Sequence, residues 1–142
     1  MYSTKYSVSI HILSMIALKK EKAITSDYIA HSVNTNPALV RRLMSSLKRA
    51  GLIKSQTRIG VVGLGKNSDE ISLLEVFRAV EKEQRLFAIH TDTNDDCPIG
   101  ARIGDVLEHI SDGVQDKFEK KLDSILLSDI LENLNMTDET KC

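Results

Sequence analysis

The stretch ITSDYIAHSVNTNPALVRRLMSSLKRAGLI, residues 24–53, carries signals that end one short helix and start another within a few residues. Thr25 or Ser26 can cap the first helix, because a hydroxyl oxygen accepts a hydrogen bond from the free N–H groups of a first turn. Asn36 can cap the second helix, and Pro37 suits its first position. The connection is so short that the two helices must pack against each other as a crossed hairpin.

The hairpin has the residue types that a helix-turn-helix needs. The motif requires a small residue at the helix crossing, an apolar residue three positions later, then a residue that tolerates a positive φ, and two buried positions in the second helix. A residue that tolerates the left-handed conformation should also follow the second helix. The residues at these positions are Ala30, Val33, Asn34, Val40, Leu43 and Gly51. Helical hairpins that bind no DNA can show the same pattern, so the exposed surface has to carry the functional argument.

The second helix has an apolar inward stripe and a polar, cationic outward face. Recognition helices read base edges with residues near their N-terminal end, and arginine can bind guanine O6 and N7 with two hydrogen bonds. Arg41 and Arg42 lie at that depth, whereas Lys48 and Arg49 lie further along and suit phosphate contacts. The predicted DNA-binding residues, with one more from the hairpin that follows, are Ser26, Asn36, Pro37, Arg41, Arg42, Ser45, Arg49 and Arg58.

The charge is distributed very unevenly. Residues 1–66 hold 11 Lys and Arg against 2 acidic residues, and residues 67–142 hold 8 against 18. Residues 36–66 hold seven cations and no acidic residue. Such asymmetry predicts a half that binds a polyanion, joined to a half with another role. The alternative is two solvated faces that compensate each other.

Further elements are predicted on both sides of the helical hairpin. A first helix runs from a cap at Ser3 or Thr4 to about Leu18; it is apolar on two sides, and a partner subunit is expected to cover the second side. The glycine-punctuated segment 52–70 predicts a two-stranded wing whose Arg58 can enter a minor groove. Ser72 and Glu75 form a capping box for a helix that reaches about Glu83.

The C-terminal half is dominated by one long helical pattern. Apolar residues recur at three- and four-residue steps over about six turns, at Ile99, Ile103, Val106, Ile110, Val114, Phe118 and Leu122. Cys97 is predicted to be the N-cap of this helix, with Pro98 at the first helical position. A helix of this length extends past so small a body, so its expected partner is its own copy in a homodimer. A short helix over about 128–134 and a tail with Cys142 follow.

These elements predict a mainly α fold with a small β-hairpin. A winged helix-turn-helix domain would span residues 1–84, and a linker, long dimerisation helix and tail would span residues 85–142. No apolar run reaches the roughly 18 to 20 residues of a membrane span, so no membrane partner is expected. The N-terminal segment is expected to be a structural helix, not a signal peptide, and the two widely separated cysteines indicate a reducing cytoplasm.

The order of the features resembles the IscR/CymR family of bacterial winged-helix repressors over essentially the whole chain. It is carried by Thr4 and Tyr6, by Ile29–Ala30, by the segment NPALVRRLMSSLKRAGLI, by the glycine-rich wing after it, by the segment EISLLEVFRAVE, and by a cysteine before a long helix. The resemblance implies a homodimer with paired C-terminal helices on an operator of two half-sites. It implies that Arg41 and its neighbours enter the major groove and Arg58 the minor groove. Some members have an acidic residue where Arg41 stands, so the operator need not match theirs. The GVVGLGK wing, which lies next to Arg58, also lacks the fuller double-glycine loop of the family.

The cysteines leave several hypotheses open. Iron–sulfur members of the family use three closely spaced cysteines, and this chain has one there, so neither a cluster nor a zinc site with His90 is expected and no cofactor is predicted. Cys97 is either a redox sensor, with Cys142 as a resolving thiol, or a structural residue. The chain is therefore predicted to be a repressor that responds to an oxidant or electrophile. The alternatives are a regulator with a small-molecule effector and a protein-binding winged helix. A cysteine hydrolase, and any enzyme, is disfavoured.

Overall fold

The computed structural model of the chain describes residues 3–19, 24–56 and 58–134, without the side chain of Val62. Six α-helices, one short 3-10 helix and two strands follow one another in this part of the chain. Their bounds are α1 Lys5–Leu18, α2 Ser26–Val33, α3 Pro37–Arg49, β1 Ile53–Gln56, β2 Gly60–Leu64, η1 Ser68–Glu70, α4 Leu73–Val80, α5 Ile103–Asp123 and α6 Leu127–Leu134. The fold is therefore mainly α with a small antiparallel sheet, as predicted.

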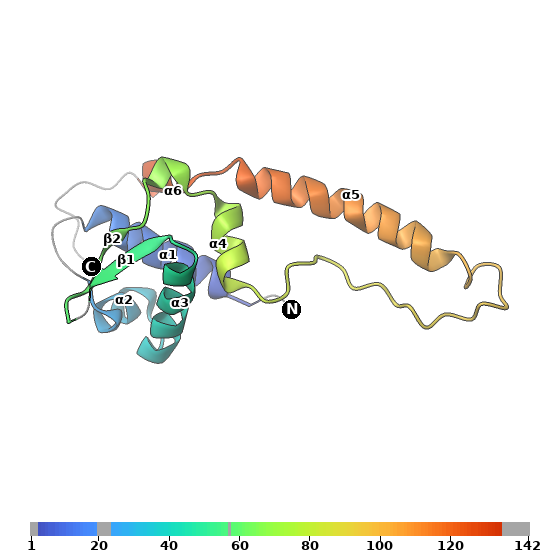
Figure 1. Cartoon of the computed structure of the whole chain (residues 1–142), viewed down its shortest axis with the longest axis horizontal. Helices are drawn as coiled ribbons and strands as arrows, with labels where there is room; N and C mark the ends of the chain where they lie inside the picture. Colours follow the sequence, from blue (N-terminus) through green and yellow to red (C-terminus); the bar gives the residue numbers. More distant parts are fainter. Residues whose placement is uncertain (1–2, 20–23, 57, 135–142) are drawn as a thin grey trace.

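The molecule consists of a compact body and a long arm (Figure 1). The body contains α1 to α4, the two strands and α6. The arm is made by α5 and by residues 81–102, which leave α4, run beside α5 to its far end and turn back into it. The predicted boundary between two domains at residue 84 stays a prediction. Helix α6, which follows that boundary, packs on the part of the chain before it: Leu127 N–H donates to Ile71 O, and Leu127 is fully buried.

The ends of α2 and α3 confirm the expected capping residues. Thr25 Oγ1 accepts a hydrogen bond from Tyr28 N–H at 3.1 Å, and Asn36 Oδ1 accepts one from Ala38 N–H at 2.7 Å. Asn34 ends α2 with φ 60°, and Gly51 follows α3 with φ 78°. Both lie in the left-handed region, which Asn and Gly tolerate best. The short polar connection therefore has the geometry of a helix-turn-helix.

Helix α1 lies at the centre of the body, and both of its apolar sides are covered by the same chain. It contacts α2, α3, α4, β2 and α6, and Ile12 and Leu13 are completely buried. The prediction that a partner subunit covers its second side is therefore wrong. Helix α6 is more than a hundred residues away in sequence, so the local pattern of α1 could not show that it packs there.

The wing is a two-stranded antiparallel hairpin with a bulge between Lys54 and Ser55. An isolated bridge joins Ile24 to Val61, so the segment before α2 acts as a minimal third strand. The bridge is formed by Ile24 N–H, which donates to Val61 O at 3.2 Å. Val61 pairs with Ser55 near the turn of the hairpin, so the segment before α2 holds the outer half of the wing.

Two predicted helix boundaries are wrong. Helix α4 ends at Val80, not near Glu83, because Glu81 adopts an extended conformation and its carboxylate accepts hydrogen bonds from Ser3 Oγ at 2.8 Å and Tyr6 N–H at 3.3 Å. Helix α5 begins at Ile103 after an N-cap position at Arg102.

Cys97 is consequently not the N-cap of α5, and Pro98 is not its first residue. Residues 93–101 instead form a separate turn, in which Thr93 Oγ1 donates to Gly100 O at 2.6 Å and Cys97 N–H donates to Asn94 O at 3.2 Å. A side chain at Gly100 would collide with the backbone of Asn94. These hydrogen bonds form within residues 93–101, so α5 begins only after this turn, at Ile103.

The hydroxyl of Ser9 is fully buried in α1 and has no hydrogen-bond partner within the described residues. An unpaired buried hydroxyl costs free energy. We expect Ser9→Ala to raise the free energy of unfolding by about 1 kcal/mol in chemical denaturation. The matched control is Ser14→Ala, since Ser14 Oγ donates to Ile10 O at 2.8 Å. Equal losses of stability in both variants would contradict the assignment.

Candidate nucleic-acid interface

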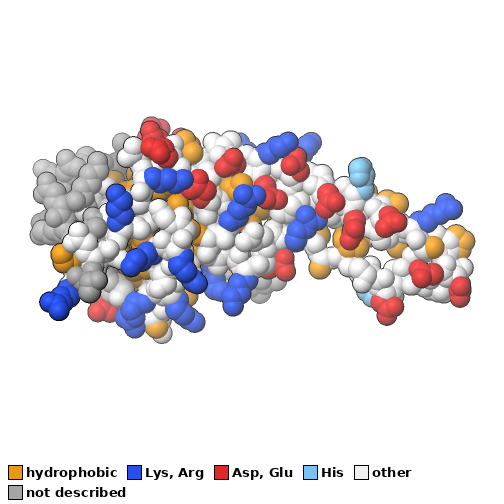
Figure 2. Space-filling view, viewed as in Figure 1, with side chains coloured by type: hydrophobic (Ala, Val, Ile, Leu, Met, Phe, Trp, Pro, Cys, Tyr) orange, Lys and Arg blue, Asp and Glu red, His pale blue; other side chains and the backbone are white. Residues whose placement is uncertain are grey.

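The outward face of α3 is exposed and cationic along its whole length. Val40, Leu43 and Leu47 hold the helix against the body, and this apolar stripe turns Arg41, Arg42 and Arg49 outward. Figure 2 shows Lys and Arg side chains gathered on the side of the body that carries α3 and the wing, whereas acidic side chains are frequent along the arm. The charge asymmetry of the sequence therefore appears on the molecular surface as a cationic side of the body and a more acidic arm.

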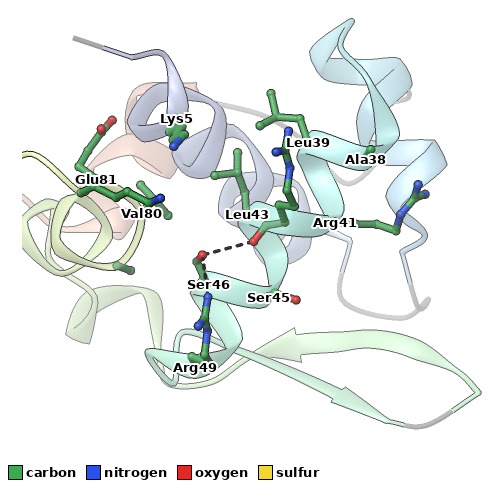
Figure 3. A pocket seen from close by; sticks show the side chains of 13 residues that line it. Lys5, Ala38, Leu39, Arg41, Leu43, Ser45, Ser46, Arg49, Val80 and Glu81 are labelled. Atoms are coloured by element: carbon green, nitrogen blue, oxygen red, sulfur yellow. Dashed lines mark hydrogen bonds between the residues drawn. The ribbon is translucent and has the colours of Figure 1, made fainter.

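A groove of about 720 Å³ runs between α3 and the ends of α1 and α4 (Figure 3). Arg41, Arg42 and Arg49 line it on the α3 side, and Lys5 and Lys82 line it on the other. Sequence reasoning missed the two lysines, which lie far from α3 in the sequence. The fold brings them to the groove because α1 and α4 both pack on α3. No local signal in the sequence identifies them.

One acidic residue, Glu81, also lines this groove. Its carboxylate is already used by the first turn of α1, where it accepts hydrogen bonds from Ser3 Oγ and Tyr6 N–H. None of the ion pairs within the described residues involves Arg41, Arg42, Arg49 or Arg58. The groove and the α3 face therefore keep a net positive charge that a polyanion can neutralise.

Arg58 lies at the exposed tip of the wing, where its backbone has φ 76°. For an L-residue this conformation costs roughly 1–2 kcal/mol relative to an ordinary one, and glycine would adopt it without that cost. The positive φ marks Arg58 as a strained position, and its part in DNA binding stays a prediction. The side chain extends the cationic surface beyond α3.

The remaining predicted DNA-binding residues lie at helix starts or on the α3 face. Ser26 is the first residue of α2 and is half-buried, since Thr25 takes the cap position. The side-chain oxygen of Asn36 caps α3 by accepting a hydrogen bond from Ala38 N–H, and Pro37 is the first residue of that helix. Ser45 is exposed on α3 and lines the groove. The part of these four residues in DNA binding stays a prediction.

Cys97 lies at the far end of the arm, in the turn before α5, 17 residues after Val80, where α4 ends. Backbone N–H groups of Gly100 and Ile99, which donate to the thiol, lower the pKa of Cys97 below its ordinary value. His90 Nε2 hydrogen bonds to Asp92 O at 3.1 Å rather than to the thiol. Cys142 lies outside the described residues. These hydrogen bonds favour the thiolate form of Cys97, and His90 is not bound to the thiol as the base of a cysteine hydrolase would be.

The described part of the chain contains no group of three or more His, Cys, Asp and Glu side chains able to hold a metal ion. One cysteine at the tip of the arm is too few for an iron–sulfur cluster, which is held mainly by several thiolates. Within the same residues, no helix is long and apolar enough to cross a membrane.

Comparisons with known proteins agree with this geometry. The family model Rrf2, described as an iron-dependent transcriptional regulator, matches residues 2–133. The chain is 41% identical over 134 residues to YwnA of Bacillus subtilis (strain 168), which carries the name of an HTH-type transcriptional regulator; the match covers 94% of this chain and 99% of YwnA.

Solved structures with the same fold include one described as a DNA-binding protein, 37% identical with a TM-score of 0.72, which covers 89% of this chain and 98% of that one. CymR, described as the global cysteine regulator of B. subtilis, is 26% identical with a TM-score of 0.67, over 93% of this chain and 96% of CymR. These relatives are regulators, not enzymes. With its winged helix and cationic α3 face, the chain belongs to the Rrf2 family of DNA-binding transcriptional regulators.

Proposed function

We propose that this regulator is a sequence-specific repressor, which acts by occupying an operator of two half-sites as a homodimer. The observation that carries the proposal is the α3 face, whose arginines are exposed, lie beside a cationic groove and form no ion pair within the described residues. Repression rests on the resemblance to winged-helix repressors of the CymR type.

The interface divides into residues that read bases and residues that bind phosphate. Arg41 and Arg42 lie near the N-terminal end of α3, so they are assigned to base edges in the major groove. Lys5, Lys82 and Arg49 border the groove and are assigned to phosphates, which position the protein without specifying sequence.

The homodimer is supported by the exposed apolar side of α5. Val106, Ile110 and Val114 follow one another at four-residue steps, and Ile110 is 56% exposed. The base of the helix differs, because Phe118 packs edge-to-face on Phe77 of α4 with ring centroids 5.5 Å apart. The distal apolar stripe fits a second copy of the same helix, which would join two bodies through their arms.

The test is selection of bound duplexes from a random-sequence pool, followed by measurement of affinity against salt concentration. We expect an enriched inverted repeat and a steep linear fall of log affinity with log salt, since about 0.9 counterions are released per neutralised phosphate. Binding that is weak and identical for all duplexes would overturn sequence-specific recognition and favour a winged helix that binds protein.

Removal of the wing arginine should separate DNA binding from stability. We expect Arg58→Gly to weaken operator binding about tenfold, equivalent to about 1.4 kcal/mol, while the free energy of unfolding stays equal or rises, because glycine relieves the positive φ. Arg58→Lys, which keeps the charge and the backbone strain, serves as the control and should bind more tightly than the glycine variant. Unchanged operator affinity in Arg58→Gly would remove the wing from the interface.

We further propose that the signal is an oxidant or electrophile that modifies Cys97. The thiolate attacks hydrogen peroxide, forms sulfenic acid and releases hydroxide. The modified sulfur accepts the Gly100 and Ile99 N–H groups less well, so the turn at the arm tip loosens. Iron has no assigned step, because the donor groups do not fit it. A small-molecule effector is the other candidate signal.

Mild peroxide should weaken operator binding by wild-type protein by about fivefold or more, the lower end of common allosteric couplings. Cys97→Ser should not respond, and Cys142→Ser shows whether a second thiol takes part. Equal responses of wild type and Cys97→Ser would exclude Cys97 from the mechanism.

A further inference from the structure

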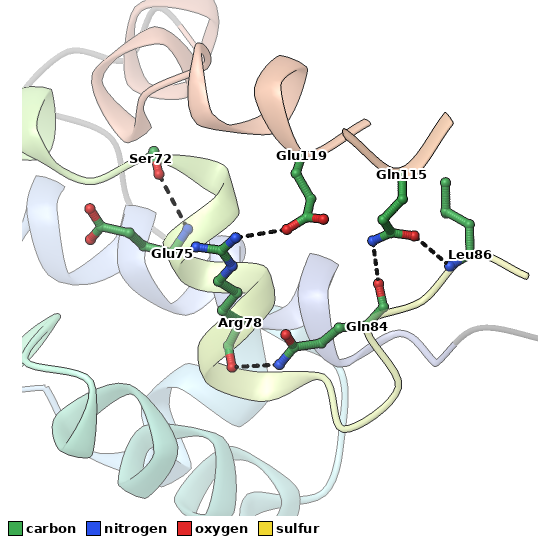
Figure 4. Close-up of polar contacts among 7 residues, drawn as sticks. All are labelled: Ser72, Glu75, Arg78, Gln84, Leu86, Gln115 and Glu119. Atoms are coloured by element: carbon green, nitrogen blue, oxygen red, sulfur yellow. Dashed lines mark hydrogen bonds and ion pairs between the residues drawn. The ribbon is translucent and has the colours of Figure 1, made fainter. Parts of the chain in front are cut away.

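A buried amide on α5 fastens the linker that leaves the body to the long helix. Gln115 is 5% exposed, although most of its neighbours on α5 are exposed. Its Oε1 accepts a hydrogen bond from Leu86 N–H at 2.9 Å, and its Nε2 donates one to Gln84 O at 2.7 Å (Figure 4). One side chain thus binds two backbone groups of the linker.

A second set of contacts fixes the base of α5 to α4. Arg78 of α4 pairs with Glu119 at 2.7 Å, and Gln84 Nε2 donates to Arg78 O at 3.3 Å. The guanidinium of Arg78 and the amide of Gln115 lower the pKa of Glu119 below its ordinary value. Gln115 therefore lies between two sets of contacts: Phe118 and Glu119, also on α5, bind Phe77 and Arg78 of α4, and the linker binds Gln115 itself. Figure 4 shows this continuous series of contacts from α4 to α5.

We propose that Gln115 is a positioning residue: by fastening the linker to α5 it sets the direction of the arm relative to α3, and hence the half-site spacing that the regulator selects. The proposal rests on the proposed dimeric operator binding. Gln115 touches no DNA in this assignment and acts only through the orientation of the body on the arm.

Because the arm is long, a small rotation at the base of α5 produces a large displacement of its far end. Helix α5 has 21 residues and is therefore about 30 Å long at 1.5 Å per residue. A tilt of about 10° at its base moves its far end by roughly 5 Å, which exceeds the 3.4 Å rise of one base pair. If α5 joins the two subunits, the same tilt displaces each recognition helix relative to its partner. A fixed base is thus required for discrimination between spacings.

The experiment uses the full chain and duplexes that carry the selected half-sites at the preferred centre-to-centre spacing or shifted by one and two base pairs, together with a single half-site. The test variant is Gln115→Leu, which keeps the bulk of the side chain and loses both hydrogen bonds. The matched control is Asp112→Asn, which weakens the exposed ion pair between Arg85 of the same linker and Asp112 of α5. Thermal unfolding is measured for each variant.

For Gln115→Leu we expect about a tenfold loss of discrimination between the preferred and shifted spacings, as the loss of two hydrogen bonds allows, with single half-site affinity within about twofold of wild type. Asp112→Asn should keep the wild-type preference, because exposed ion pairs contribute little. An unchanged spacing preference in Gln115→Leu overturns the proposal. Equal losses on the half-site and on all spacings also overturn it, because they reveal only a destabilised body. Failure of the proposed dimeric operator binding is distinguishable, since it is seen in the wild type as an absence of spacing preference.

Discussion

Ile110→Asp should convert the regulator to a monomer and lower its affinity for the two-half-site operator by roughly 10²–10⁴-fold. Ile110 lies in the middle of the exposed apolar stripe of α5 and is 56% exposed in the single chain. In a dimer paired through this stripe the introduced carboxylate would be buried without a partner, which costs several kcal/mol. The second half-site would then no longer be bound by a tethered partner, and the gain from tethering would be lost.

Sedimentation measures the oligomeric state, and duplexes with one or two half-sites separate dimerisation from DNA contact. His109→Asp is the matched control: it adds an acid one position away, on a different side of α5, where the chain is also exposed. It should remain dimeric. A dimeric Ile110→Asp variant would show that α5 does not pair through this stripe, and single half-site affinity should be unchanged in either case.

Arg41→Ala should cost about 1–3 kcal/mol of operator affinity and relax sequence preference at one base position of each half-site. The side chain is exposed on the N-terminal half of α3, and no ion pair within the described part of the chain competes for it. Its loss should therefore remove a base contact without lowering the stability of the protein. Competition between the selected operator and every single-base variant of it measures the effect.

Lys48→Ala is the comparison for Arg41→Ala, since it removes the same charge from the last turn of the same helix. We expect it to weaken binding to all duplexes alike and to reduce the salt dependence by about one unit of slope. If Arg41→Ala behaved in the same way as Lys48→Ala, Arg41 would be a phosphate contact and the assignment of base reading would be wrong.

Local chemistry made the helix-turn-helix predictable. The side chains of Thr25 and Asn36 cap the helices that their sequence neighbours form, and the positive φ of Asn34 and Gly51 follows from their residue type and their position at the end of a helix. The α3 face was predictable for the same reason, because a helical period separates its buried stripe from its arginines. Such features depend on residues within about one or two turns of each other.

Features that depend on distant contacts could not be predicted. Helix α4 stops early because Glu81 binds the first turn of α1, and the second side of α1 is covered by α6 instead of a partner. Lys5 and Lys82 reach the groove only through the packing of α1 and α4 on α3. The turn around Cys97 imitates a helix start in sequence, since a proline follows a capping residue, but the bond from Thr93 to Gly100 closes it first.

Because the chain returns to the body through α6, the arm is an excursion whose length can change between related proteins. Leu73 N–H donates to Ile125 O at 2.9 Å, so the arm returns to the body beside the first residue of α4, whereas it leaves the body at the other end of α4, after Val80. Residues can therefore be added to or deleted from the arm without a change to the core. An insertion of seven residues in α5 would lengthen it by about 10 Å and restore nearly the same helical angle, matched by about three extended residues in the linker. Insertions of other lengths would turn the apolar stripe away from its partner, so arm length should vary in steps of about two helical turns.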